Sequence, residues 1–195
     1  MRKIFLAAMI SNLLLSSCIE SLYPLTKDKN QMVFKKELLG VWKEADGTEY
    51  IVDSAGDKAY RVTIVGKDKN HESGSFDTSY LLMTVVSVKG KYFLDCSPDV
   101  NQTFFKEAAE QTANLIVPAH YIFKVNSIST NAVEIGSIDG NEVSKLIQQK
   151  KFSINYEAVQ KDLALLVHKP QILQQKFTEL EKFPSAYEKT ILKKQ

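Results

Sequence analysis

Residues 80–96 read YLLMTVVSVKGKYFLDC, and this stretch decides the fold class. The first nine residues are apolar on both faces of an extended chain, which is typical of a strand covered on both sides. Lys89-Gly90-Lys91 forms a tight turn, and residues 92–96 pair back as the next strand. We therefore predict an antiparallel hairpin, with a barrel interior against one face and a helix or the N-terminal segment against the other.

Similar patterns predict strands over most of the chain. Residues 59–65 alternate well, with Tyr60, Val62 and Ile64 on one face. We expect further strands over residues 41–43, 49–53, 121–128, 132–138, 152–156 and 163–168, and helices over 101–113, over 141–149, after Pro170 and from Pro184 to the end. The prediction is a mainly β, β-rich α+β fold: an antiparallel barrel of about eight or nine strands with accessory and C-terminal helices, because closure removes exposed sheet edges.

The N-terminus carries an export signal. Met1-Arg2-Lys3 is basic, residues 4–15 are apolar except for Ser11 and Asn12, and small residues follow at 16–17. Twelve residues span only about 18 Å as a helix, whereas a bilayer core needs about 30 Å. A cleaved signal over residues 1–17 fits this length, and a membrane span does not.

Charge and cysteine content limit the partners and the disulfides that the rest of the chain can have. Removing Arg2 and Lys3 leaves as many basic residues as the 23 acidic ones, so the body is formally neutral. Neutrality argues against a nucleic-acid partner, which requires a basic surface. Cys18 and Cys96 are the two cysteines. If Cys18 is modified, Cys96 has no partner for an intramolecular disulfide.

The segment Leu15-Ser16-Ser17-Cys18 resembles the bacterial lipobox. That resemblance implies cleavage between Ser17 and Cys18, acylation of Cys18 and attachment to a bilayer. The cell envelope is the expected location, with the outer membrane or periplasmic face favoured. Residues 18–36 then form a lipidated tether, unless Leu22, Tyr23 and Leu25 dock on the body, and residues 37–195 form one domain.

Leu39-Gly40-Val41-Trp42 resembles the Gly-x-Trp start of lipocalin-like barrels, in which the tryptophan closes one end. Val117-Pro118-Ala119-His120 and the C-terminal helices are similar to an uncharacterised family of envelope lipoproteins. The resemblance implies a lipocalin-like barrel domain.

Few side chains suggest chemistry. Trp42 and His120 are the candidate pocket residues, Trp42 as a pocket floor and His120 at the start of a strand on a barrel rim. Cys96 shares a face with Tyr92 and Leu94 and is interpreted as a small hydrophobic residue. Asp95 and Asp99 flank Ser97-Pro98 and are interpreted as turn residues. The spacing of the three histidines indicates no metal site, no motif indicates a cofactor, and the lysine-rich stretch 189–194 is expected to be solvated.

The leading functional hypothesis is non-catalytic binding of a small apolar ligand or an envelope protein. One alternative is an envelope hydrolase that uses His120 with Asp95 or Cys96. Another is a structural or assembly subunit without a pocket. An apolar cavity above about 300 Å³ would favour ligand binding, whereas a filled barrel with an exposed apolar patch would favour a protein partner.

Overall fold

The hairpin over residues 80–96 forms as predicted. In the computed structural model, which describes residues 18–67, 76–100, 119–160 and 163–195, strands β6 (Phe76–Val88) and β7 (Lys91–Pro98) pair antiparallel. Lys89 and Gly90 connect them with φ values of 48° and 78°. Two consecutive positive φ values are the geometry of a two-residue turn whose twist matches the strands.

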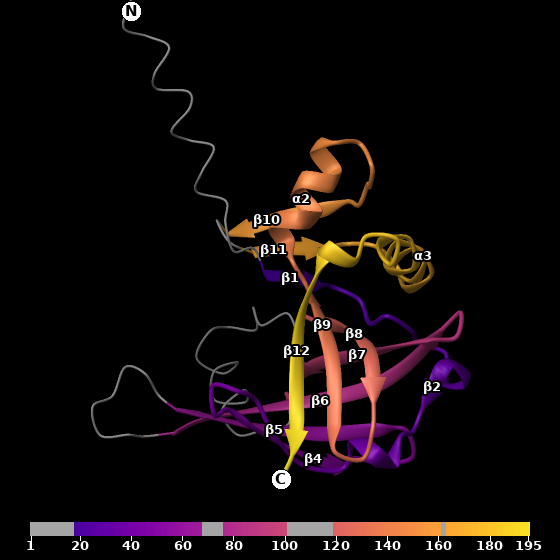
Figure 1. Cartoon of the computed structure of the whole chain (residues 1–195). Helices are drawn as coiled ribbons and strands as arrows, with labels where there is room; N and C mark the ends of the chain where they lie inside the picture. Colours follow the sequence, from indigo (N-terminus) through magenta and orange to yellow (C-terminus); the bar gives the residue numbers. More distant parts are fainter. Residues whose placement is uncertain (1–17, 68–75, 101–118, 161–162) are drawn as a thin grey trace, which may run out of the picture.

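Eight strands close into an antiparallel barrel, which confirms the predicted fold class (Figure 1). Neighbours around the barrel follow chain order, and the last strand, β12, completes the circle by pairing with both β9 and β3. The remaining barrel strands are β3 (Gly40–Lys43), β4 (Glu49–Ser54), β5 (Ala59–Lys67), β8 (Tyr121–Ile128), β9 (Ala132–Ile138) and β12 (Tyr187–Lys194). Short β2 (Met32–Val33) pairs with β6 at Val85 and Val86, next to Thr84, where the pairing of β6 with the start of β5 begins.

A second group of elements packs outside the barrel and is called the outer layer here. It consists of α2 (Gly140–Gln148), α3 (Pro170–Leu180) and a three-stranded sheet of β1 (Cys18–Ser21), β10 (Tyr156–Gln160) and β11 (Leu163–Leu166). Apart from β1, the chain builds this layer between β9 and β12. Figure 1 shows the layer gathered at one end of the molecule, with β12 running from it down the barrel. Three 3₁₀ turns complete the described elements: η1 (Lys29–Gln31), η2 (Lys36–Leu38) and η3 (Pro184–Ala186).

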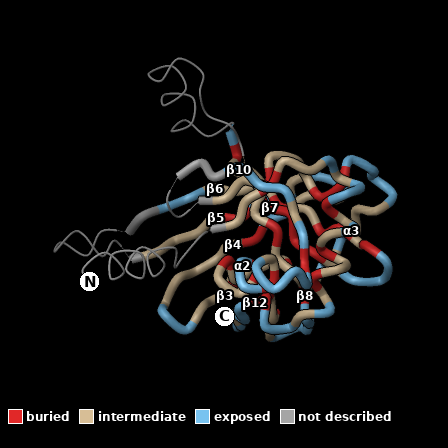
Figure 2. Tube along the Cα trace, turned by 90° about the horizontal axis from the view of Figure 1, so that it is seen from above, coloured by how far each residue is buried: buried red, intermediate tan, exposed pale blue. Residues whose placement is uncertain are grey.

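The strand β6 is covered on both faces, as its sequence predicts. Val85 and Val86 are neighbours on opposite faces, and each is 0% exposed. Val85 belongs to the core inside the barrel, and Val86 packs with Leu25, Phe93 and Phe177 in a second core beneath the outer layer. Figure 2 shows buried residues along β7 and the neighbouring barrel strands, with exposed residues at the periphery.

Residues 18–36 dock on the body, so the alternative to a free tether is the one observed. β1 pairs in parallel with β11, with Cys18 opposite Leu163 and Ser21 opposite Leu166. Leu25 is 0% exposed and Thr26 is 3% exposed. Leu25 and Tyr23 pack with Val86 and Phe93, so apolar contacts with the outer face of β6 and β7 help to hold the segment in place.

Four other predictions have clear outcomes. The helix expected over 141–149 is α2, capped by the Asp139 side chain, and the helix after Pro170 is α3. The final helix expected after Pro184 is wrong: residues 187–194 form β12, because the gap between β3 and β9 supplies backbone partners on both sides. The strand expected over 152–156 is also wrong, since Phe152 packs beside α2 and β10 begins at Tyr156. The helix expected over 101–113 lies outside the described residues.

Candidate functional site

The barrel is not completely filled. Its interior holds a cavity of about 230 Å³, and every one of the eight barrel strands contributes lining side chains. We call this cavity the lumen. Almost all of its lining is aliphatic, aromatic or sulfur-containing: Leu38, Trp42, Tyr50, Val52, Val62, Ile64, Leu81, Met83, Leu94, Cys96, Phe123, Val133, Ile135 and Leu192, with only Glu44, Ser137 and Thr190 more polar. The lumen therefore suits an apolar guest.

One end of the lumen is closed by residues 34–38. The Trp42 indole Nε1 donates to the Leu38 carbonyl at 2.7 Å, and the Tyr60 hydroxyl donates to the Lys35 carbonyl at 3.1 Å. The Tyr60 ring stacks on Phe34 with ring centroids 4.9 Å apart. Polar atoms of buried aromatic side chains thus find backbone partners, so closing this end leaves these donors satisfied.

Gly40 and Lys194 complete the closed end. Gly40 has φ 119°, and a Cβ there would lie 3.0 Å from the Cε atom of Lys194. The Lys194 ammonium lies 5.0 Å from the centre of the Trp42 ring, within range of a cation–π contact. Lys194 is therefore part of the barrel closure, and the prediction of a solvated tail is wrong for this residue. Glycine is required before Trp42 because the backbone is left-handed and the lysine passes close by.

The opposite end of the lumen opens where its lining residues are only half-buried. We call Glu44, Tyr50, Ser137 and Thr190 the mouth residues. The Tyr50 hydroxyl donates to Glu44 Oε2 at 2.8 Å. Burial raises the pKa of Tyr50, and the hydrogen bond to the Glu44 carboxylate raises it further. The mouth therefore presents a carboxylate and a neutral phenol at the edge of an apolar interior.

Cys96 points into the lumen and is 4% exposed. Burial raises the pKa of its thiol, and the charge of the adjacent Asp95 acts in the same direction. A thiol held neutral in an apolar wall is a poor nucleophile. The interpretation of Cys96 as a hydrophobic lining residue agrees with its place beside Leu94.

Asp95 points the other way, out of the barrel and under the outer layer. Its Oδ1 lies 2.6 Å from His120 Nδ1, and its Oδ2 accepts the Leu25 backbone N–H at 2.6 Å. The backbones of His120 and Ser21 exchange two hydrogen bonds, of 2.7 and 2.8 Å. We call Asp95, His120, Ser21 and Leu25 the docking cluster. Its contacts fasten the N-terminal segment to β7 and to the start of β8.

The structure brings together one pair of the residues that the sequence grouped, His120 with Asp95, and separates the others. Trp42 lines the lumen, whereas His120 lies outside and is not among the lining residues. His120 meets Asp95 but not Cys96, because residues 95 and 96 occupy opposite faces of β7. The turn interpretation is wrong for Asp95, which lies within β7, is buried and has two partners. Asp99 is also buried and pairs with Arg61 Nε at 3.2 Å.

A hydroxyl nucleophile for His120 is also missing from the docking cluster. Ser21 Oγ donates to the Tyr23 carbonyl at 2.7 Å and accepts the Tyr23 backbone N–H. Its hydroxyl is therefore engaged in a local turn. Among the described residues, the contacts of Asp95 and His120 serve to fasten the N-terminal segment to the barrel.

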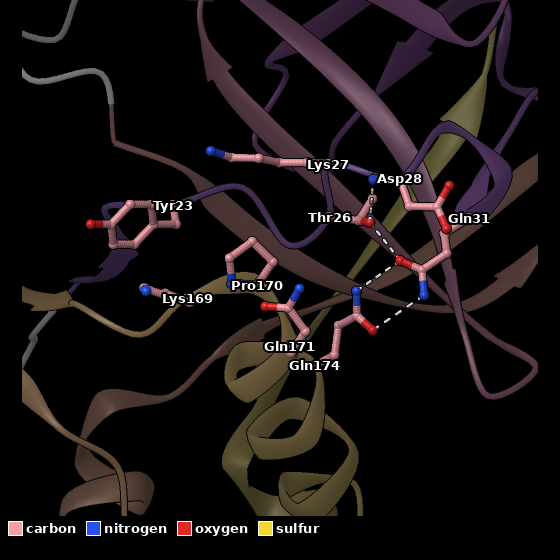
Figure 3. Close-up of a pocket in the computed structure, with 9 residues that line it drawn as sticks. All are labelled: Tyr23, Thr26, Lys27, Asp28, Gln31, Lys169, Pro170, Gln171 and Gln174. Atoms are coloured by element: carbon pink, nitrogen blue, oxygen red, sulfur yellow. Dashed lines mark hydrogen bonds between the residues drawn. The ribbon is translucent and has the colours of Figure 1, made fainter.

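A second depression lies outside the barrel, between the N-terminal segment and the start of α3 (Figure 3). It is larger, at about 680 Å³, but its charged lining residues Lys27, Asp28 and Lys169 are exposed. Gln174 Nε2 donates to Gln31 Oε1 at 2.9 Å, and Thr26 donates to the same oxygen. This cleft is an open groove in which the side-chain amides of Gln31 and Gln174 bond to each other, so we place the candidate site in the lumen.

In the described ranges, no group of three or more His, Cys, Asp or Glu side chains is placed to hold a metal ion. Within the same ranges, no helix is both long and apolar enough to cross a membrane.

The fold and the lumen together define a closed antiparallel eight-stranded barrel with an internal apolar cavity. Comparison of the chain with protein-family models, with curated proteins and with solved structures found no match. Function is therefore argued from the geometry of the lumen and from the N-terminal sequence.

Proposed function

We propose that this protein is a lipid-anchored envelope protein that binds a small apolar molecule inside its barrel. The observation that carries the proposal is the lumen of about 230 Å³, lined by apolar side chains from all eight strands. Small barrels either fill their interior with side chains or hold one small ligand there. This barrel leaves the space open although its strands are rich in large apolar residues.

The volume sets the size of the guest. At about 230 Å³ the lumen falls short of the roughly 300 Å³ that was expected of a ligand-binding cavity, so the proposal is limited to guests smaller than a drug-sized molecule. It exceeds the roughly 150 Å³ of an apolar cavity that binds benzene. Taking about 30 Å³ for each water-sized group, the lumen holds about eight non-hydrogen atoms. At about 0.5–1 kcal/mol for each atom, the dissociation constant lies between about 1 µM and 1 mM.

The chain has a built-in probe for this binding. Trp42 is its single tryptophan and lines the lumen, so its fluorescence responds to a guest. We expect titration of the purified protein with short-chain alcohols to change this fluorescence with saturation. The variant Ile135→Phe adds atoms to the lining and should weaken binding at least tenfold.

The control for that variant lies on the neighbouring strand. Ile191 lies on β12, opposite Glu134 of β9. This residue is 53% exposed on the outside of the barrel. Ile191→Phe makes the same chemical change outside the lumen and should leave binding unaltered. Equal effects of the two substitutions, or no saturable signal in the wild type, would overturn ligand binding in the lumen.

The anchor is the second part of the proposal. The basic start, the apolar run and Ser16-Ser17-Cys18 support lipidation of Cys18. Each buried CH₂ of an acyl chain contributes about 0.8 kcal/mol to membrane binding, so several chains make release slow. We expect cells grown with a labelled fatty acid to label the wild type and not Cys18→Ser. Label on the Cys18→Ser variant would contradict attachment at this residue, and Cys96→Ser serves as the matched control.

The exposed apolar residues do not favour the alternative of a protein partner. Phe34, Val100, Tyr156, Ile172 and Ile191 are the large exposed ones in the described part of the chain, and they come from five separate segments. Single exposed apolar side chains are normal on protein surfaces. The unfilled lumen is the feature that requires a function.

A further inference from the structure

The mouth of the lumen has a charge that the apolar wall does not explain. Among the described residues that line the lumen, Glu44 is the only one with a carboxylate, and none is a lysine, arginine or histidine. Apolar cavities with a few well-placed polar groups use those groups to orient a ligand. Glu44 therefore identifies which end of a ligand lies at the mouth.

The local backbone holds Glu44 in this place. Its N–H donates to the Thr48 carbonyl at 2.9 Å, and its own carbonyl accepts the Gly47 N–H at 3.1 Å. The residue thus opens the tight connection between β3 and β4, which fixes the direction of its side chain. Tyr50, two residues after Thr48, donates its hydroxyl to Glu44 Oε2.

The neighbouring Glu49 shows what a structural glutamate looks like here. Glu49 Oε1 lies 3.1 Å from Lys43 Nζ on the outside of the same hairpin. Within the described residues, Glu44 has no such cation, and its only side-chain partner is the Tyr50 hydroxyl. A carboxylate at the edge of a low-dielectric interior attracts a positive charge more strongly than one in water.

We propose that the ligand of the lumen is a small apolar primary amine, with its ammonium group at Glu44 and Tyr50 and its hydrocarbon part inside. This inference rests on the proposed function and specifies its ligand. An ammonium group has three N–H donors and no acceptor. The mouth supplies a carboxylate, the phenol oxygen of Tyr50 and the hydroxyls of Ser137 and Thr190, all of which accept.

The same geometry ranks other head groups. A neutral alcohol can donate one hydrogen bond to the Glu44 carboxylate, but it has no positive charge, so it lacks the Coulomb attraction that an ammonium group adds. A fatty-acid carboxylate would meet Glu44 as a like charge. We therefore expect the order amine, alcohol, carboxylate for a constant hydrocarbon chain.

The test uses the full chain and three probes of one chain length: hexylamine, hexanol and hexanoate at pH 7.4. Each has seven or eight non-hydrogen atoms, which matches the lumen, and an alkylamine is protonated at this pH, as a lysine side chain is. Titrations followed by Trp42 fluorescence should give an affinity for hexylamine about tenfold above that for hexanol. Hexanoate should bind most weakly.

Two matched variants locate the effect. Glu44→Gln should lower the affinity for hexylamine about tenfold and leave that for hexanol within about twofold. Glu49→Gln removes the same charge from the outer face of the same hairpin and should change neither affinity. Circular dichroism of both variants checks that the barrel is intact.

The outcomes separate the two proposals. If hexanol binds as tightly as hexylamine, or if Glu44→Gln and Glu49→Gln behave alike, the lumen binds ligands but the amine assignment is wrong. If none of the three probes gives a saturable signal, ligand binding in the lumen itself fails. A preference for hexanoate would also overturn the amine assignment.

Discussion

The two faces of β7 differ in how completely they are packed. On the outer face, Phe93 is 1% exposed and meets Phe177 of α3 edge to face, at 5.8 Å between ring centroids. On the inner face, Leu94 and Cys96 are buried too, but they border the unfilled lumen. One alternating strand thus supplies both a filled interface and the wall of a cavity.

The difference follows from what faces each side. The outer layer is a set of separate elements that can approach β7 until side chains interlock, as in any protein core. Strands of a closed barrel cannot move inward, because their hydrogen bonds and tilt fix the diameter. Space remains inside wherever side chains are too small to fill it. The outer face can therefore carry stability, while the inner face is free to carry binding.

The largest expected effect tests this division at adjacent residues. Phe93→Ala should lower the free energy of unfolding by about 3–5 kcal/mol, because it empties a filled core. Leu94→Ala should cost about 2 kcal/mol, near the lower limit for such changes, because Leu94 already borders empty space. Urea unfolding measures both values. A greater loss for Leu94→Ala would mean that the lumen wall carries more stability than the outer core.

The docking cluster gives the next effect. Asp95→Ala should cost about 3 kcal/mol, because it leaves the Leu25 N–H buried without an acceptor and removes the partner of His120. Asp95→Asn keeps an oxygen for Leu25 and should cost less. Hydrogen exchange should show faster exchange of the Leu25 amide in Asp95→Ala. Unchanged protection there would show that the segment is held by apolar packing alone.

The smallest effect concerns the inner face and alkaline pH. Burial raises the pKa of Cys96 above its ordinary value of 9.0, so the folded state retains a proton that the unfolded state loses. The resulting stabilisation is complete below about pH 9 and is lost as pH rises further. Between pH 8 and pH 10, Cys96 should account for a loss of about 1 kcal/mol.

Parallel urea titrations of the wild type and Cys96→Ala isolate that contribution. The absolute stability of Cys96→Ala is allowed to differ, because the comparison concerns only the change with pH. Tyr50 and Tyr187, whose pKa values burial also raises, act in both proteins and cancel. If the free energy of unfolding changes with pH equally in both proteins between pH 8 and pH 10, the Cys96 thiol is in contact with water.

Much of the barrel could be predicted because hairpins are local. The turn at Lys89-Gly90 and the alternation in residues 59–65 specify pairing between strands that are neighbours in the chain. The apolar residues on both faces of β6 indicate a second layer. Residues 187–194 do not reveal a strand by their sequence, because half of their side chains are charged and Pro184 favours a helix start. Their strand conformation comes from β3 and β9, which lie far away in the sequence.

The candidate site was only partly predictable for a similar reason. Trp42 follows from the Gly-x-Trp segment, but the place of Glu44 in the lumen lining depends on the barrel being closed. The contact of Asp95 with His120 depends on the pairing of β7 with β8, which a single sequence does not specify. An acidic residue within an apolar strand was the available signal for a buried partner.

The closing pair of strands also sets an order of events during biosynthesis. β3 is the first barrel strand to be made and β12 is the last, yet Trp42 and Lys194 must become neighbours. Until residues 187–194 arrive, β3 and β9 each present an unpaired edge to other chains. Contacts between such distant parts of a chain form slowly. If the chain is exported as proposed, it folds after it has crossed the membrane, and both edges become available at the same time.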